Sequence, residues 1–215
     1  MSLLKQWTKG EGVWGIWRLD ESERELRDLL PAKPYYDEEL ALLKSSSRRL
    51  EYLGARVLLN TLCGKEPRIL HSPSGKPYLE AEATHISISH TRGYIAVVIH
   101  PTWNVGIDIE QYGEKVKRVA SRFIRTDEIP NRTLLSEREL LYYYLLHWSA
   151  RETLFKLLDL SEIDFLKHFY IHPFVLSQNG TCMGEEYRTE QNKHFQISYM
   201  LHDDFVCTWA VEDCL

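Results

Sequence analysis

Cysteine is scarce in this chain, and its spacing fits neither a disulfide framework nor a metal site. The 215 residues contain four cysteines without a Cys-x-x-Cys pair, namely Cys63, Cys182, Cys207 and Cys214. A domain stabilised by disulfides usually carries a denser set. We therefore predict reduced thiols in a cytoplasmic protein.

Long apolar runs are absent as well. A helix that spans a bilayer needs about 20 predominantly apolar residues, and no stretch of the sequence approaches that length. The start, Met-Ser-Leu-Leu-Lys-Gln-Trp, lacks the arrangement of a secretory signal peptide. These absences predict a soluble intracellular protein without a membrane partner.

Basic charge is not in excess, since 26 Lys and Arg residues stand against 31 Asp and Glu residues. The resulting net charge of -5 argues against a general nucleic-acid binder, which usually shows a clear basic excess. An anionic ligand must therefore be bound by a local cluster of Lys and Arg. The remaining composition, 44% hydrophobic and 27% charged, is typical of a globular protein with one domain or two small ones.

Apolar periodicity predicts an α+β fold. The expected helices are residues 45–62, 114–125 and 136–158, and the expected strands are residues 13–19, 85–90, 94–100, 105–110 and several between 169 and 211. A Ser-x-x-Glu capping pattern at Ser136 starts the last helix, and a second at Ser149 predicts a kink or restart. Short connections favour antiparallel pairing. The break at Pro101–Asn104 predicts subdomains 1–104 and 105–215.

The run Gly106-Ile107-Asp108-Ile109-Glu110 is the most informative motif. Side chains alternate along a strand, so Asp108 and Glu110 share one face about 7 Å apart at the backbone. Such a pair suits a hard divalent cation that takes oxygen ligands. Taken alone, a D-x-E pattern is better explained as the polar face of a surface strand.

A second motif lies in the last predicted helix, from Trp148 to Lys156. Glu152 and Lys156 are one turn apart and share a face, which by itself describes an ordinary surface pair. Trp148, Leu154 and Phe155 are expected in the core.

A third motif, Ser89-His90-Thr91-Arg92-Gly93, ends a predicted strand. Its hydroxyls, histidine and arginine could receive a phosphate, or could form a solvated hairpin connection. His90 is not expected to bind zinc, because no Cys or His partner lies at metal-site spacing.

Together these motifs resemble the signature of the 4'-phosphopantetheinyl transferases. The chain supplies Ser89-His90, then Gly106-x-Asp108-x-Glu110, then Trp148-x-x-Arg151-Glu152-x-x-x-Lys156 in the family order. The Gly75-Lys76-Pro77 turn and the helix from Arg48 to Leu53 also resemble family features. The length resembles the two-domain, surfactin-synthetase-activating type.

The resemblance implies two similar α/β subdomains related by a pseudo-two-fold axis, with coenzyme A in the cleft between them. It implies a magnesium ion held by Asp108, Glu110 and Glu152. The implied catalytic residues are Glu152, Lys156 and Asp108, with Glu152 as the base for the acceptor serine and Lys156 steadying phosphate charge. The implied coenzyme A contacts are Arg49, Lys76, Ser89, His90 and Lys156, with Lys76 near the adenine.

The implied reaction transfers 4'-phosphopantetheine from coenzyme A to a serine of an apo acyl- or peptidyl-carrier protein and releases 3',5'-ADP. Fatty-acid, polyketide and nonribosomal peptide biosynthesis all use this step. Carrier proteins are acidic and helical, so the basic face of residues 115–125 is a candidate docking surface. An internal pseudo-dimer needs no partner chain, which predicts a monomer.

The motif departs from the family pattern at Arg151, where lysine is usual, and at Thr153, where a small residue is more frequent. Arginine keeps the charge but changes the hydrogen-bond geometry. Two other functions stay open. One is a non-catalytic homologue that binds coenzyme A or a carrier, with its chemistry impaired by Arg151. The other, which rests on the carboxylates alone, is a magnesium-dependent phosphohydrolase.

Overall fold

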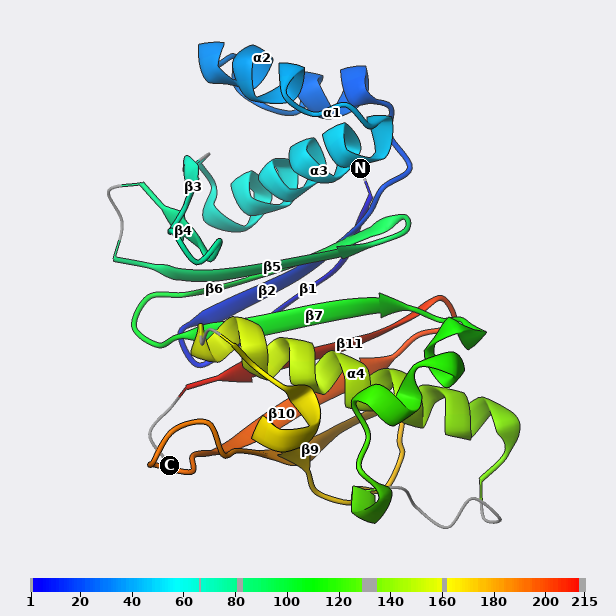
Figure 1. The fold of residues 1–215 in the computed structure, drawn as a ribbon. Coiled ribbons are helices and arrows are strands. Elements are labelled where there is room, and N and C mark those ends of the chain that lie inside the picture. The colour runs from blue at the N-terminus through cyan, green and yellow to red at the C-terminus, as the bar shows by residue number, and fades with distance from the viewer. Residues whose placement is uncertain (1, 66, 81–82, 129–134, 160–161, 213–215) are drawn as a thin grey trace. The chain divides into compact units, whose positions relative to one another are not determined.

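The computed structural model describes residues 2–65, 67–80, 83–128, 135–159 and 162–212. Two compact units divide the chain, residues 1–102 and 103–215. Each unit combines helices with an antiparallel sheet, which confirms the predicted α+β class (Figure 1). Cys63, Cys182 and Cys207 form no disulfide, and Cys214 lies outside the described residues.

A sheet in the order β1-β2-β6-β5 forms the first unit, with every pair antiparallel. Its strands are β1 (Leu3–Lys9), β2 (Gly12–Arg18), β5 (His85–Thr91) and β6 (Tyr94–His100). The predicted hairpin of β5 and β6 is confirmed, and Gly93 turns it with a φ of 79°. A second, two-stranded sheet joins β3 (Ile69–His71) to β4 (Pro77–Leu79).

Helices cover one face of the first unit's main sheet (Figure 1). They are α1 (Glu23–Asp28), α2 (Pro34–Ala41) and α3 (Ser46–Cys63). The longest, α3, packs on β2 and β6 and contributes Leu53 and Leu58 to a core that also contains Trp17 and Ile95. This helix matches the expected segment and ends at Gly64, whose φ of 67° suits glycine in a left-handed cap.

The second unit has a sheet in the order β7-β11-β10-β9-β8, again antiparallel throughout. Its strands are β7 (Val105–Gln111), β8 (Phe169–Ile171), β9 (Asn179–Glu186), β10 (His194–Leu201) and β11 (Phe205–Val211). The long helix α4 (Glu137–Leu158) packs on β7 and β11, and the short helix α5 (Phe165–His168) precedes β8. Figure 1 shows α4 lying along these strands.

Helix α4 is continuous, so the predicted kink at Ser149 is wrong. The capping box forms at Ser136 and Glu139, while Ser149 is buried in the middle of the helix. Its hydroxyl bonds the Thr208 hydroxyl at 2.9 Å and therefore is not needed as a cap. No helix within the described residues is both long and apolar enough to cross a membrane.

The α-helix predicted over residues 114–125 is also wrong. Two 3-10 helices, η1 (Glu114–Arg118) and η2 (Ala120–Arg122), occupy this segment, and a third, η3 (Thr126–Glu128), follows. Apolar residues spaced three apart, such as Val116 and Val119, fit a 3-10 helix as well as an α-helix. Packing against α4 decides the outcome, because Val116, Phe123 and Ile124 are buried in a core with that helix.

Candidate functional site

Gly106 permits a close approach of β7 to α4. A Cβ atom on Gly106 would collide with the Thr153 carbonyl oxygen and would lie 3.0 Å from Leu157 Cβ. The glycine of the Gly106-x-Asp108-x-Glu110 motif is thus required by backbone packing. Since side chains two apart share a face of a strand, Asp108 and Glu110 are presented to the same helix.

Asp108 and Lys156 form an ion pair across this contact. Lys156 Nζ lies 2.7 Å from Asp108 Oδ1 and also donates to the Ile107 carbonyl oxygen at 3.2 Å. The Asp108 side chain is 4% exposed and that of Lys156 is 26% exposed. The ammonium group of Lys156 is therefore the positive charge beside the buried Asp108 carboxylate on β7.

Trp148, which was expected only as a core residue, holds Glu110 in place. The indole N–H of Trp148 donates to Glu110 Oε1 at 2.7 Å, while the ring packs on Phe123 and Phe165. A half-buried tryptophan usually finds an acceptor for its N–H. Burial, together with the neighbouring Asp108 and Glu152 carboxylates, raises the pKa of Glu110 to about 7.

Glu152 lies one helical turn before Lys156 and shares the charge environment of β7. Burial and the Asp108 carboxylate raise the pKa of Glu152 to about 7, while Lys156 opposes this effect. Three carboxylates from two elements thus repel one another beside a single lysine. Such a site is stabilised by an additional cation.

The spacing of these carboxylates bears on the kind of cation. Within the described parts of the chain, one group of three metal-ligand residues has ligand atoms that all lie within 4.8 Å of one another, and it is not Asp108, Glu110 and Glu152. Mg²⁺ keeps several waters and takes one or two carboxylates plus substrate phosphates. Oxygens that share one Mg²⁺ at about 2.0–2.1 Å lie at most about 4.2 Å apart, so the three carboxylates would have to move closer together to bind a single ion.

Hydroxyl groups fix the position of α4 over the sheet. Thr208 on β11 pairs directly with Asp108 on β7. Its hydroxyl lies 2.6 Å from the Thr153 hydroxyl and 2.9 Å from the Ser149 hydroxyl, and all three side chains are buried. Thr153 therefore has a structural partner, which accounts for a hydroxyl at this position.

Arg151 points away from the carboxylates, into a buried ion pair. Its Nη2 donates to both oxygens of Glu128, at 2.5 and 2.6 Å, and neither side chain is exposed. Arg151 also donates to His147 Nδ1 at 3.2 Å and to the Phe165 carbonyl oxygen at 3.3 Å. Burial lowers the pKa of His147 well below its usual value, so the ring is neutral and can accept this bond.

The expected core residues of α4 are only partly confirmed. Leu154 is fully buried and Trp148 is half-buried, whereas Phe155 is 39% exposed. On the circumference of α4, Phe155 lies between Leu154 and Lys156 and points away from the sheet. Its ring contacts Phe165.

Residues 104–210 match the family model of the 4'-phosphopantetheinyl transferase superfamily. The matched segment contains β7 and the whole of α4. It therefore includes Asp108, Glu110, Glu152 and Lys156. The chain belongs to the 4'-phosphopantetheinyl transferase superfamily. It is thus a transferase of the phosphopantetheinyl kind. A search of curated proteins found no match.

The phosphopantetheinyl transferase residues expected to meet nucleotide phosphates lie in the first unit. His90, at the end of β5, lies beside α3: its Nε2 is 3.2 Å from Arg48 Nη1 and its Nδ1 is 3.5 Å from Glu51 Oε2. Ser89 is buried and pairs with Ala96 of β6. Arg48 thus lies beside His90, and its place next to Arg49 is the signal in the sequence that pointed to it.

Arg49 and Lys76 lie on different elements of the first unit. Arg49 Nε donates to Glu23 at 2.8 Å and Nη1 donates to the Leu43 carbonyl oxygen at 3.1 Å. Lys76 follows the tight turn at Gly75, whose φ is 90°, and the Lys76 backbone N–H donates to Ser72 Oγ at 3.1 Å. The structure thus joins His90 to α3 and places Lys76 on a separate hairpin.

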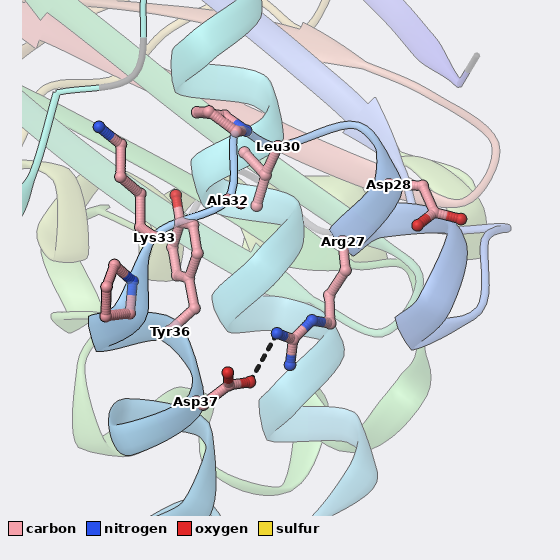
Figure 2. A pocket seen from close by; sticks show the side chains of 9 residues that line it. Arg27, Asp28, Leu30, Ala32, Lys33, Tyr36 and Asp37 are labelled. Atoms are coloured by element: carbon pink, nitrogen blue, oxygen red, sulfur yellow. Dashed lines mark hydrogen bonds and ion pairs between the residues drawn. The ribbon is translucent and has the colours of Figure 1, made fainter.

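A pocket of about 580 Å³ lies beside α1 and α2 in the first unit of this superfamily member. Its charged lining includes Arg27, Lys33 and Asp37, and Arg27 Nη2 is paired with Asp37 Oδ1 at 2.6 Å (Figure 2). None of the motif residues lines this pocket, and no sequence feature pointed to it.

Proposed function

We propose that this chain transfers the 4'-phosphopantetheine group of coenzyme A to a serine hydroxyl of an apo acyl- or peptidyl-carrier protein. The observation that carries the proposal is the meeting of β7 and α4, where Asp108, Glu110, Glu152 and Lys156 form one charge cluster. These are the positions at which the sequence matches the family motif.

Asp108, Glu110 and Glu152 would hold a magnesium ion together with water and the pyrophosphate of coenzyme A. The raised pKa values of Glu110 and Glu152 support this assignment, because they reflect burial and, after it, the charge of neighbouring carboxylates, which a cation would offset. When bound, magnesium would lower the charge on the pyrophosphate and improve 3',5'-ADP as a leaving group.

Glu152 is suited to accept the proton of the acceptor serine. In the metal-free protein, burial and the Asp108 carboxylate raise the pKa of Glu152 to about 7, whereas a bound cation would lower it and keep the carboxylate ionised, as a general base requires. In the proposed step, serine Oγ bonds to the phosphorus that carries pantetheine, the bond from that phosphorus to the bridging oxygen breaks, and 3',5'-ADP leaves. The serine proton passes to a Glu152 carboxylate oxygen, directly or through water, and then to solvent.

Lys156 provides fixed positive charge for this transfer. Its Nζ is 2.7 Å from Asp108 Oδ1, so the ammonium group is held in place before any phosphate arrives. Phosphoryl transfer depends on positioning and charge neutralisation more than on covalent catalysis. Asp108 therefore contributes in two ways, as a metal ligand and as the residue that orients Lys156.

The 3',5'-ADP part of coenzyme A would be bound by residues of the first unit, Arg49, Lys76, Ser89 and His90, with Lys156 on the phosphate. Arg48 is an additional candidate, since it lies 3.2 Å from His90. Arg49 is paired with Glu23 and would have to share its guanidinium between that carboxylate and a phosphate.

The carrier would dock on the basic residues of the segment 115–125. Lys115, Arg118 and Arg122 are exposed there, whereas Lys117 is paired with Glu114 and Arg125 with Asp127. Exposed basic groups steer an acidic partner and act mainly on the association rate.

The decisive experiment is a mass-shift assay on a panel of apo-carrier proteins with coenzyme A and Mg²⁺. We expect the mass of at least one carrier to rise by one phosphopantetheine and an equal amount of 3',5'-ADP to appear. Glu152→Gln should abolish most turnover. Glu137→Gln, an exposed glutamate in the first turn of α4, is the matched control and should retain activity.

Three outcomes separate the candidate functions. No mass gain on any carrier, beside an active reference enzyme, would contradict the proposal. Coenzyme A binding by calorimetry without transfer would indicate a non-catalytic homologue. Release of 3',5'-ADP without a carrier would indicate a phosphohydrolase. Arg151, which stands where the family usually has lysine, is bound to Glu128 and not to Asp108, Glu110 or Glu152. This contact supports a catalytic function, because the change from lysine to arginine leaves those three carboxylates untouched.

A further inference from the structure

Two histidines and a glutamate from neighbouring strands of the second unit bring their side chains together. Glu185 lies on β9, His194 lies on β10, and His172 follows the last residue of β8. One ligand atom of each residue lies within 4.8 Å of the other two. Among the residues that the structure describes, this is the one group of three with such convergence.

Strand register produces this cluster. Glu185 pairs directly with His194 in the antiparallel ladder of β9 and β10. On its other side, Glu185 pairs with Tyr170 of β8, two residues before His172. The His172 backbone N–H continues that ladder by donating to the Met183 carbonyl oxygen at 2.9 Å. Direct and diagonal partners on adjacent strands have Cβ atoms roughly 5–8 Å apart, close enough to share a ligand.

The cluster lies on the sheet face opposite α4. A Cβ on Gly184 would point at Leu154 of α4, so the next residue, Glu185, points to the other face. Asp108 instead faces α4, where it meets Lys156. The three-residue cluster is therefore separated by the sheet from the proposed transfer site.

Both imidazoles converge on one carboxylate oxygen. Glu185 Oε1 lies 2.5 Å from His172 Nε2 and 3.2 Å from His194 Nδ1. The Tyr187 hydroxyl donates to the other oxygen, Oε2. The two Glu185 oxygens are thus held in place by partners on both sides. The Glu185 side chain is 15% exposed, while the histidines keep open sides of 41% and 58%.

We propose that His172, Glu185 and His194 bind a divalent transition-metal ion of the zinc class. Two imidazole nitrogens and one carboxylate oxygen are a ligand set that zinc accepts with a water in the fourth position. Imidazole ligands favour zinc over Mg²⁺, which prefers oxygen. The ion ties β8, β9 and β10 together on one face.

Little movement is needed to form this coordination. Tetrahedral ligands at about 2.0–2.1 Å from zinc lie roughly 3.3 Å from one another. The Glu185–His194 separation of 3.2 Å already matches that value. The Glu185–His172 separation of 2.5 Å must widen, which rotation of the partly exposed His172 ring allows. Tyr187 keeps Glu185 oriented, as partners of metal-bound carboxylates commonly do.

Calorimetric titration of the whole chain with Zn²⁺ alone tests the site. Accessible thiols are alkylated first, so that cysteine does not compete. We expect the unsubstituted chain to bind one Zn²⁺ more than the His172→Gln, His194→Gln double variant, Mg²⁺ binding to be the same in both, and Zn²⁺ to raise the melting temperature of the unsubstituted chain. His172→Gln and His194→Gln should each weaken the affinity roughly 100-fold, and Tyr187→Phe about 10-fold. Co²⁺ in place of Zn²⁺ should give the visible absorption of a four-coordinate site.

His202→Gln is the matched control. His202 is 40% exposed and lies 3.9 Å from the Asp204 carboxylate, but it is not one of the three converging residues. This variant should bind Zn²⁺ like the unsubstituted chain. Equal affinity in the His172→Gln, His194→Gln double variant and the unsubstituted chain would overturn the proposal. So would a six-coordinate Co²⁺ spectrum. Glu185→Gln keeps the size of the side chain and provides the test if a histidine variant fails to fold. Because binding is the readout, failure here leaves the transferase proposal untouched.

Discussion

Arg151 and Glu128 form an ion pair in which both side chains have no exposure to solvent, with Nη2 at 2.5 and 2.6 Å from the two carboxylate oxygens. Glu128 also accepts the Ile171 backbone N–H at 2.6 Å and the Arg125 backbone N–H at 2.8 Å. The pair therefore connects α4, η3 and β8. It explains how the family position usually held by lysine is used in this chain.

The first prediction concerns this pair. Arg151→Met leaves the Glu128 charge buried without its cation, and we expect a loss of about 3–5 kcal/mol in the free energy of unfolding, measured by urea denaturation. The Glu128→Gln, Arg151→Met double variant should lose less than the sum of the single changes. Arg138→Met, in a pair with Asp203 where the side chains are 61% and 87% exposed, is the control and should change stability little.

Arg151→Lys separates structure from catalysis. Lysine keeps the charge next to Glu128 but loses the donors to His147 and the Phe165 carbonyl oxygen, so stability should fall. The folded fraction should still transfer phosphopantetheine at the unsubstituted rate. A large loss of turnover without loss of fold would contradict the separation.

The second prediction follows from the raised pKa values of Glu110 and Glu152. Between the usual value of 4.5 and the folded value of about 7, the unfolded chain has released protons that the folded chain keeps. The stability of the metal-free protein should therefore fall as pH rises through this window and then level off. Glu152→Gln removes the charge and should stabilise the metal-free protein at pH 8 by about 1–2 kcal/mol, after allowance for solvent screening.

Melting curves at several pH values provide the measurement for that prediction. At about pH 4, below the usual value, Glu152→Gln and the unsubstituted protein should melt alike. Mg²⁺ should stabilise the unsubstituted protein more at pH 8 than at pH 5.5, and this increment should shrink in Glu152→Gln. Stability that rises from pH 5 to pH 8 because of these residues would show that their carboxylates are not crowded.

The third prediction concerns Lys156. The ammonium group lowers the pKa of Glu152, so Lys156→Met should raise it and shift the acid limb of the pH–rate profile for transfer upward. Turnover should also fall roughly 100-fold, because fixed charge beside the phosphate is lost. Lys167→Met is a suitable control, since Lys167 is 78% exposed in its pair with Asp164. A lower rate with an unmoved pH profile would argue against contact between Lys156 and the base.

The fourth prediction concerns Gly106. Gly106→Ala places a methyl group against the Thr153 carbonyl oxygen, and we expect a loss of about 1–3 kcal/mol in stability together with reduced transfer. The methyl group would meet backbone atoms of Thr153 and Leu157 in α4, which cannot turn aside as a side chain can. Gly113→Ala is the control, because a Cβ there meets nothing within 4 Å and its φ of 172° is extended. Equal behaviour of the two variants would mean that α4 does not limit the approach to β7.

Local patterns in the sequence were sufficient for the longest elements and for the family, but not for β1, α1, α2, β3 and β4. Alternating and helical periodicities act over a few residues, so β2, α3, β5, β6, β7 and α4 could be predicted from neighbouring side chains alone. The motif carboxylates and Lys156 were named instead from the resemblance to the family signature. The spacing of Val116 and Val119, in contrast, fits two helix types, and only burial against α4 selected the 3-10 form.

Tertiary structure decided every contact between residues distant in the chain. Arg151 finds Glu128, Trp148 finds Glu110, and His172 and His194 meet at Glu185 because helix packing and strand register bring them together. The sequence alone determined that a buried arginine or a half-buried indole would need a partner. Which partner it finds depends on registers set by the whole core, and those are long-range properties that a local pattern does not encode.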